Sequence, residues 1–136
     1  MEKYRLDHDI KVLCVSAKSF PDGIMEAFDK LHSLLPVSAK RQFFGLSRPN
    51  ENGVIGYKAA AEELVQGEAG KAIHELFVIQ GGEYISLVIN DYLNDIPAIG
   101  NAFHQLIAHP DIDPHGYCVE WYFNEKDVRC MVKLKT

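Results

Sequence analysis

The sequence predicts an α+β fold, an antiparallel sheet with two main helices packed against it. Two helical apolar patterns and the strand-like runs around them, in the same order each time, point to this class. The composition agrees, because 47% hydrophobic and 24% charged residues in a chain of 136 are typical of a globular protein with its own core. We therefore expect a single domain spanning residues 1–136.

The two predicted helices share one apolar pattern. The segments GIMEAFDKLHSLLP (23–36) and AIGNAFHQLIAHP (98–110) both place apolar side chains at i, i+3, i+4 and i+7, which form one face of a helix. Pro21 and Pro97 stand near the two helix starts, where a missing N–H costs nothing. The matched positions are Ile24 with Ile99, Ala27 with Ala102, Phe28 with Phe103, and Leu31 with Leu106.

Each predicted helix follows one strand-like run and precedes two more, which a polar turn joins. The runs around the first helix are 10–17, 42–48 and 54–62, and those around the second are 83–90, 117–123 and 128–134. The turns are PNENG and NEKD. This order predicts a duplicated strand–helix–strand–strand unit, with repeat one at about 9–63 and repeat two at about 75–134.

Two segments remain between these units. The run ELFVI (75–79) is typical of a strand, and the Gly81–Gly82 pair predicts a turn through which it forms a hairpin with YISLVI (84–89). The segment LVQGEAGKAI (64–73) is expected to be a linker or a short irregular helix.

Charge and hydropathy exclude several classes of partner. The net charge is −5, and the basic residues are scattered, with Lys133 and Lys135 as the nearest approach to a basic stripe. We therefore expect no direct nucleic-acid binding, and DNA binding would require another protein, because no helix-turn-helix precedes the domain. No apolar run approaches the roughly 20 residues that span a bilayer, and the N-terminus is too charged for a signal peptide. We expect a soluble, cytoplasmic protein without membrane contact.

No pattern predicts a metal or a cofactor. The segment HQLIAHPDIDPHG gathers histidines and aspartates without an accepted zinc spacing, and P-loop, GxGxxG and GxSxG motifs are lacking. The three cysteines lie in apolar runs, where a small buried and inert thiol is expected. The residues in question are His104, His109, His115, Asp111 and Asp113, and Cys14, Cys118 and Cys130.

Glu120 is the unusual residue of the last predicted hairpin. If NEKD is a four-residue loop, Phe123 pairs with Val128, Trp121 with Cys130 and Val119 with Val132. These side chains then share one apolar face, and Glu120 lies on the opposite face. Its expected companions there are Cys118, Tyr122, Arg129, Met131 and Lys133.

Two interpretations of that face stay open. In one, Glu120 is solvated and pairs loosely with Arg129 or Lys133. In the other, it lies on the floor of a groove, where an acidic group among aromatic rings suits a flat cationic ligand.

The order of these segments resembles that of the GyrI-like family. The strand YCVEWYF with its central Glu, the hairpin FFGLSRPNENGVIGYKAA and the run IQGGEYISLVI carry the resemblance, which extends over about residues 9–134. It implies a stand-alone effector-binding domain, of the type also attached to AraC-type and MerR-type transcription activators. In that family a Glu on the first strand of the last hairpin lies in an aromatic groove between the two halves and contacts cationic, hydrophobic compounds. The corresponding residue here is Glu120.

The resemblance and the alternation of side chains together give a set of candidate ligand contacts. Tyr122 shares the face of Glu120, whereas Trp121 points to the other face. Other aromatic residues that could line the groove are Phe20, Phe43 and Tyr92. The predicted ligand-binding residues are Glu120, Tyr122, Trp121, Tyr57, Phe44, Tyr84 and Met131.

The resemblance also implies two alternatives to a binding protein that sequesters or senses a small molecule. Some GyrI-like proteins are hydrolases that open strained cyclopropane rings, and there Glu120 would activate water beside Trp121 or Tyr122. Others are protein-interaction modules such as gyrase inhibitors, although nothing in this sequence specifies a protein partner.

Overall fold

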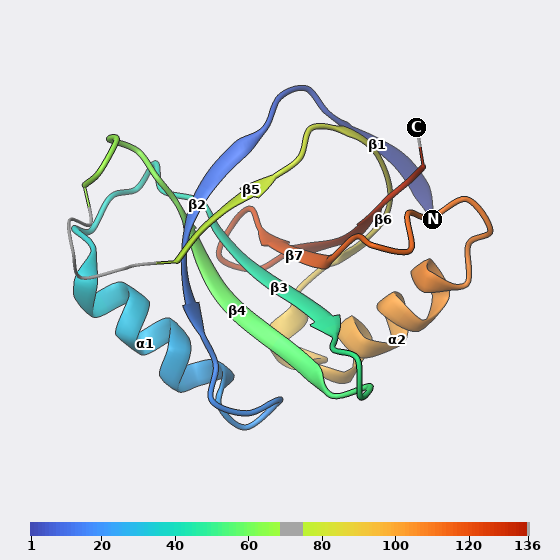
Figure 1. Cartoon of the computed structure of the whole chain (residues 1–136), viewed down its shortest axis with the longest axis horizontal. Coiled ribbons are helices and arrows are strands. Elements are labelled where there is room, and N and C mark those ends of the chain that lie inside the picture. The colour runs from blue at the N-terminus through green and yellow to red at the C-terminus, as the bar shows by residue number, and fades with distance from the viewer. Residues whose placement is uncertain (69–74, 136) are drawn as a thin grey trace.

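The structure is a computed structural model that describes residues 1–68 and 75–135. Within these two ranges, eight strands form one antiparallel sheet and two helices pack on it, which confirms the α+β class (Figure 1). The predicted linker at 64–73 lies in part outside the described residues. The elements are β1 (Glu2–Leu6), β2 (Ile10–Ser16), α1 (Ile24–Leu34), β3 (Phe43–Pro49), β4 (Ile55–Glu62), β5 (Glu75–Ile79), β6 (Gly82–Ile89), the 3-10 turn η1 (Tyr92–Asn94), α2 (Pro97–Ile107), β7 (Cys118–Tyr122) and β8 (Val128–Lys133).

The strand order shows how the two halves combine. The order is β1-β6-β8-β7-β3-β4-β2-β5, so that β3 and β7 pair at the middle of the sheet. The sequence β2–α1–β3–β4 is followed along the chain by β6–α2–β7–β8, with the same kinds of elements in the same order. That the two halves arose by duplication stays a prediction.

The two edge strands are exchanged between the halves. β1 precedes β2 in the chain but pairs with β6, and β5 precedes β6 but pairs with β2. The predicted hairpin of 75–79 with 84–89 is therefore wrong, and β1 was not predicted at all. The Gly81–Gly82 pair does not reverse the chain onto the strand before it; instead the chain crosses to the opposite side of the sheet. There the Gly81 N–H donates to Asp9 Oδ1 at 2.7 Å, which links the two crossing connections.

The sheet curls, and its two faces carry separate cores. On the face that we call the helix face, α1 packs against β2 and β4 while α2 packs against β6 and β8 (Figure 1). The opposite inner face is enclosed by the curl and holds a third cluster around Phe44, Leu46 and Met131. Because the helices cover the flanking strands, the central strands β3 and β7 lie between them.

The last hairpin differs from prediction by one residue. Trp121 pairs with Arg129 and Glu120 with Cys130, rather than Trp121 with Cys130. Phe123 leaves the ladder, since its N–H bonds to the Trp121 carbonyl, and the side chain of Asn124 accepts from the backbone of the following turn. The connection therefore takes one more residue than NEKD. The faces of β8 are consequently reversed relative to those of β7.

The helices have the apolar faces that their patterns predict. Leu31 of α1 and Leu106 of α2 occupy matched positions and are both fully buried against the sheet. Both helices contain 11 residues. Within the described ranges, no helix has the length and apolar character needed to cross a bilayer.

We expect Leu106→Ala to lower the free energy of unfolding by about 2–5 kcal/mol, since it leaves a cavity under α2. The neighbouring Ile107 is 52% exposed, and Ile107→Ala should change stability by less than about 0.5 kcal/mol. Urea unfolding of both variants measures the difference. Equal losses would show that α2 does not pack through Leu106.

Candidate functional site

Glu120 lies in the middle of the sheet, on the helix face between α1 and α2. It is directly opposite Gly45 of β3 on one side and Cys130 of β8 on the other. Its exposure is 8%, so the carboxylate is buried rather than solvated. The interpretation of Glu120 as a residue of a solvated outer face is therefore wrong.

Two tyrosine hydroxyls donate to the same oxygen of this carboxylate. Tyr57 of β4 donates to Glu120 Oε1 at 3.0 Å, and Tyr122 of β7 donates to the same atom. Among the described residues, Glu120 takes part in no ion pair. Two neutral hydroxyl groups, rather than a cation, therefore stabilise the carboxyl group of Glu120.

Gly45 makes this arrangement possible. Tyr57 lies two strands away from Glu120, and its hydroxyl must cross β3 to reach the carboxylate. A Cβ atom on Gly45 would lie 2.7 Å from Glu120 Oε1 and still closer to the Tyr57 hydroxyl. A side chain at this position would thus occupy the space in which the two groups meet.

Burial controls the ionisation of the site. Desolvation raises the pKa of Glu120 above its usual 4.5, and the hydrogen bonds from Tyr122 and Tyr57 offset this only in part. Burial and then the nearby Glu120 raise the pKa of both tyrosines as well. The hydroxyls consequently keep their protons and remain donors, while the carboxyl group is the one that titrates.

Aromatic rings from both halves of the chain surround these three residues. Phe28 of α1 meets the Tyr122 ring edge-on, with centroids 6.0 Å apart, and lies 6.3 Å from the Tyr57 ring. Tyr92 of η1 approaches Tyr122 from the other half at 5.3 Å, and Phe20 stacks on Tyr57 at 5.9 Å. Aromatic rings therefore form the immediate surroundings of the two tyrosines that bond Glu120.

A groove of about 1010 Å³ is lined by three of these rings, those of Phe28, Tyr92 and Tyr122, while Glu120 lies outside its lining, bonded to Tyr122. Its exposed acidic residues are Asp22 and Glu125, while its arginine, Arg41, is held by Glu68 through a contact of 2.5 Å. Most of the lining is apolar or aromatic. The lining residues are Pro21, Asp22, Ile24, Met25, Phe28, His32, Ser38, Ala39, Arg41, Gln42, Phe43, Tyr92, Ile96, Tyr122, Phe123, Asn124 and Glu125.

The predicted site residues divide between the two faces of the sheet. Glu120, Tyr57 and Tyr122 come together on the helix face, and Phe20, Phe43 and Tyr92 lie around them. The other four lie in the cluster on the inner face, away from the carboxylate: Trp121, Phe44, Tyr84 and Met131. As ligand contacts, all seven stay predictions.

The predicted cationic neighbours of Glu120 are also on the inner face. Arg129 donates to Ser86 and to Glu2, and its guanidinium lies 4.2 Å from the centre of the Tyr4 ring. Lys133 pairs with Tyr84 of the inner cluster. The expectation that either residue shares a face with Glu120 is wrong, because the longer turn reverses the faces of β8.

Sequence reasoning missed two residues of the site. The apolar pattern of the first helix places Phe28 on the face that packs against the sheet. This pattern does not show that Phe28 also contacts Tyr57 and Tyr122. Gly45 was not singled out, although an isolated glycine within a strand often marks a close approach of another group.

Cys118 and Cys130 lie near Glu120, but among the described residues neither the cysteines nor the His/Asp segment forms a side-chain hydrogen bond with it. Burial raises the pKa of Cys14 and Cys130 to about 12 and that of Cys118 to about 11, which suppresses the reactive thiolate. His109 Nδ1 accepts from the Asp111 backbone, so it stabilises a local turn. Across residues 1–68 and 75–135, no three His, Cys, Asp or Glu side chains are grouped so that they could hold a metal ion.

The fold is shared with solved structures of low sequence identity. The integron cassette protein VCH_CASS2 from the mobile metagenome of Vibrio cholerae is 12% identical, with a TM-score of 0.72 over 98% of this chain and 95% of that chain. SAV2435, solved bound to tetraphenylphosphonium, is 10% identical, with a TM-score of 0.63 over 98% and 93%. A hydrolase from Listeria innocua is 9% identical, with a TM-score of 0.61 over 98% and 90%.

No protein-family model and no curated protein matches the sequence. The structural likenesses show that this fold also occurs in those proteins. They extend over nearly the whole chain.

We expect Gly45→Ala to destabilise the protein by about 1–3 kcal/mol, because the methyl group displaces the Tyr57 hydroxyl or the carboxylate. Gly100→Ala is the matched control: Gly100 lies within α2 with open space around its Cα, and alanine there should add about 0.5–1 kcal/mol. Urea unfolding compares the two. Equal effects would contradict the close approach at Gly45.

We expect Glu120→Gln to become increasingly more stable than the wild type as pH rises. The folded state holds the Glu120 proton to higher pH than the unfolded chain does. The favourable contribution is therefore complete below pH 4.5 and is lost as pH rises through the folded pKa. Glutamine has no charge to bury at any pH. Urea unfolding of both proteins between pH 4 and 8 measures the contribution of Glu120 to the pH dependence of stability. A difference in the free energy of unfolding that does not vary with pH would contradict the raised pKa.

Proposed function

We propose that this chain is a stand-alone small-molecule-binding protein of the GyrI-like type. Its ligand is an amphipathic, aromatic cation that enters the groove formed by α1, η1 and the turn between β7 and β8. Glu120, bonded by Tyr122 and Tyr57, supplies the countercharge, and Tyr122, Phe28 and Tyr92 of the groove lining supply the aromatic surfaces.

The observation that carries this proposal is a buried carboxylate without a cationic partner among the described residues. Glu120 is 8% exposed and bonded by two neutral hydroxyls, so the ionised form is penalised by desolvation. A ligand cation would offset this penalty, because Coulomb attraction is strong where water is excluded. The tyrosine and phenylalanine rings add the attraction of an aromatic face for a positive charge.

The groove has the size and the surface that such a ligand needs. A volume of about 1010 Å³ is at the upper end of the range for drug-sized ligands. Met25 and Ile96 line it and are 75% and 54% exposed, so apolar and adaptable side chains stand at its rim. Such a surface favours a class of shapes rather than one compound.

The comparisons support the proposal at the level of fold. SAV2435 has this fold and was solved with tetraphenylphosphonium, an aromatic cation. The resemblance of the sequence to effector-binding domains points in the same direction. The biological role would be to sequester the compound or to sense it together with a separate regulator.

The raised pKa of Glu120 favours a hydrolase as the second candidate. A carboxyl group whose pKa is raised by burial is a suitable general base near neutral pH, and one likeness is to a hydrolase. In this alternative Glu120 takes a proton from water as the water oxygen bonds to a carbon of the strained ring; the ring C–C bond breaks, and its electron pair passes to an electron-withdrawing group that the substrate carries. Tyr122 orients the carboxylate. The two functions differ in whether the bound compound is recovered unchanged.

We expect tetraphenylphosphonium to bind the wild type saturably and Glu120→Gln about tenfold more weakly or worse, since the substitution removes the countercharge. Isothermal titration at pH 8 measures both affinities. Tetraphenylborate, which has the same shape and a negative charge, should not bind the groove.

Glu125→Gln is the matched control, because Glu125 is an exposed carboxylate in the groove lining and its loss should change the affinity by less than about twofold. Equal affinity of the wild type and Glu120→Gln would remove Glu120 from the binding site. Mass spectrometry of the recovered ligand, applied to strained-ring compounds as well, separates binding from hydrolysis.

A further inference from the structure

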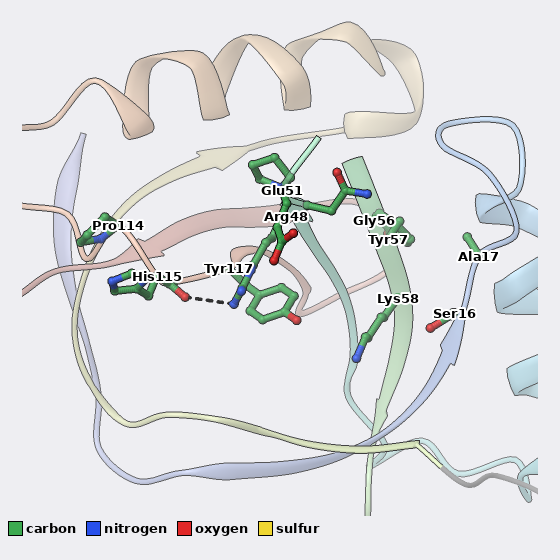
Figure 2. A pocket seen from close by; sticks show the side chains of 13 residues that line it. Ser16, Ala17, Arg48, Glu51, Gly56, Tyr57, Lys58, Pro114, His115 and Tyr117 are labelled. Atoms are coloured by element: carbon green, nitrogen blue, oxygen red, sulfur yellow. Dashed lines mark hydrogen bonds between the residues drawn. The ribbon is translucent and has the colours of Figure 1, made fainter. Parts of the chain in front are cut away.

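A second pocket lies at the end of the β3–β4 hairpin and has the opposite character from the groove. It has a volume of about 620 Å³. Its walls come from β3, β4, the end of β2 and the segment 114–117 that leads into β7 (Figure 2). We call it the basic pocket, and its lining residues are Ser16, Ala17, Arg48, Pro49, Asn50, Glu51, Gly56, Tyr57, Lys58, Pro114, His115, Gly116 and Tyr117.

The cationic side chains of this pocket are on the face of the sheet that is turned away from Glu120. Lys58 pairs with Leu46, which lies in the inner cluster, whereas its neighbour Tyr57 points to the helix face and bonds Glu120. Arg48 follows Leu46 by two positions on β3 and shares its face. The two cations are therefore on the inner face, and the basic pocket shares no lining residue with the groove, although Tyr57, which bonds Glu120, belongs to the lining of the pocket.

Aromatic rings, rather than carboxylates, are the close partners of the two cations. The Arg48 guanidinium lies 5.1 Å from the centre of the Tyr117 ring, and its Nη1 donates to the His115 carbonyl at 3.3 Å. Lys58 Nζ lies 5.9 Å from the centre of the Phe77 ring. Within the described ranges, neither cation forms an ion pair. Each is positioned by a ring that leaves its charge unneutralised.

Figure 2 shows Arg48, Lys58 and Tyr117 extending into the same space. A guanidinium that contacts a ring can still use N–H donors at its edge, and these match the two oxygens of a carboxylate. The Tyr117 ring offers a flat apolar surface beside these donors. The pocket thus combines charge for an anionic head with an aromatic face for a planar body.

The acidic groups nearby do not cancel this charge. Glu51 is an exposed residue of the hairpin turn, where solvent and salt screen it. Glu75 accepts the Ser16 hydroxyl with both of its oxygens. An adjoining cavity of about 320 Å³ shares Arg48 and Tyr117 with the pocket and adds Lys133 together with Asp113.

We propose that the basic pocket is a second ligand site, which binds a planar aromatic carboxylate through Arg48 and Lys58 with the ring against Tyr117. This site is independent of the cation groove and takes the opposite charge. The protein would then hold two unlike ligands on opposite faces of one sheet.

The test is isothermal titration of the protein with 1-naphthoate. We expect saturable binding at one site, with Arg48→Gln and Lys58→Gln each weakening it by about tenfold, the loss of one charge-assisted hydrogen bond. Arg5→Gln is the matched control, since Arg5 is an exposed arginine on β1 that pairs with Glu83, and it should leave the affinity unchanged. Glu120→Gln should also leave it unchanged, which separates this site from the groove.

A probe-side control on the wild type avoids any dependence on the folding of a variant. Naphthalene-1-carboxamide has the same rings without the charge and should bind at least tenfold more weakly. Absence of saturable naphthoate binding, equal binding of the carboxamide, or unchanged binding in both pocket variants would overturn the proposal. Displacement of naphthoate by inorganic phosphate at equal affinity would overturn it too, because the aromatic body would then contribute nothing.

Discussion

The burial of an unpaired carboxylate at the centre of the sheet is the constraint on which the helix face depends. Glu120 could not occupy this position without donors, and Tyr57 and Tyr122 supply them from two different strands. The reach of Tyr57 across β3 in turn requires Gly45 beneath it. These four residues form one unit, and the position of the helices over the flanking strands leaves room for it.

The same strands present different charges on their two faces. On β4, Tyr57 points to the carboxylate while Lys58 points to the basic pocket; on β3, Gly45 faces the carboxylate while Arg48 faces Tyr117. Successive side chains of a strand point to opposite faces of the sheet, so adjacent residues need not share an environment. The backbone of the sheet thus lies between the Glu120 carboxylate and the two cations of the basic pocket.

How far the sequence predicts the structure depends on the range of the interactions involved. The helical faces through Leu31 and Leu106 and the polar turns are local patterns, and the α+β class followed from them. The pairing of β5 with β2 is a long-range choice that the local Gly81–Gly82 signal contradicts. The predicted register of β7 against β8 is wrong for a different reason. The Asn124 side chain holds the turn after Phe123, and residue type alone does not specify the length of this turn.

The candidate site was predictable in part. Glu120 and Tyr122 follow from the resemblance and from alternation on one strand, since residues two apart share a face. Tyr57 was one aromatic among several, because its role depends on the approach over Gly45. Phe28 contributes from a helix whose apolar pattern describes packing alone, so its contact with the tyrosines appears only in three dimensions.

The exchange of edge strands sets where the chain can be divided. A fragment that ends at Glu62 contains β1, whose partner β6 would be missing, and lacks β5, which covers the edge of β2. The complementary fragment, which starts after Glu62, has the reverse defect: it contains β5 without its partner β2, and it lacks β1, which covers the edge of β6. Each fragment would expose an unpaired strand edge, a surface prone to aggregation. Sequence halves and structural halves therefore do not coincide, and a dissected or permuted version of this protein must keep β1 with the second half and β5 with the first.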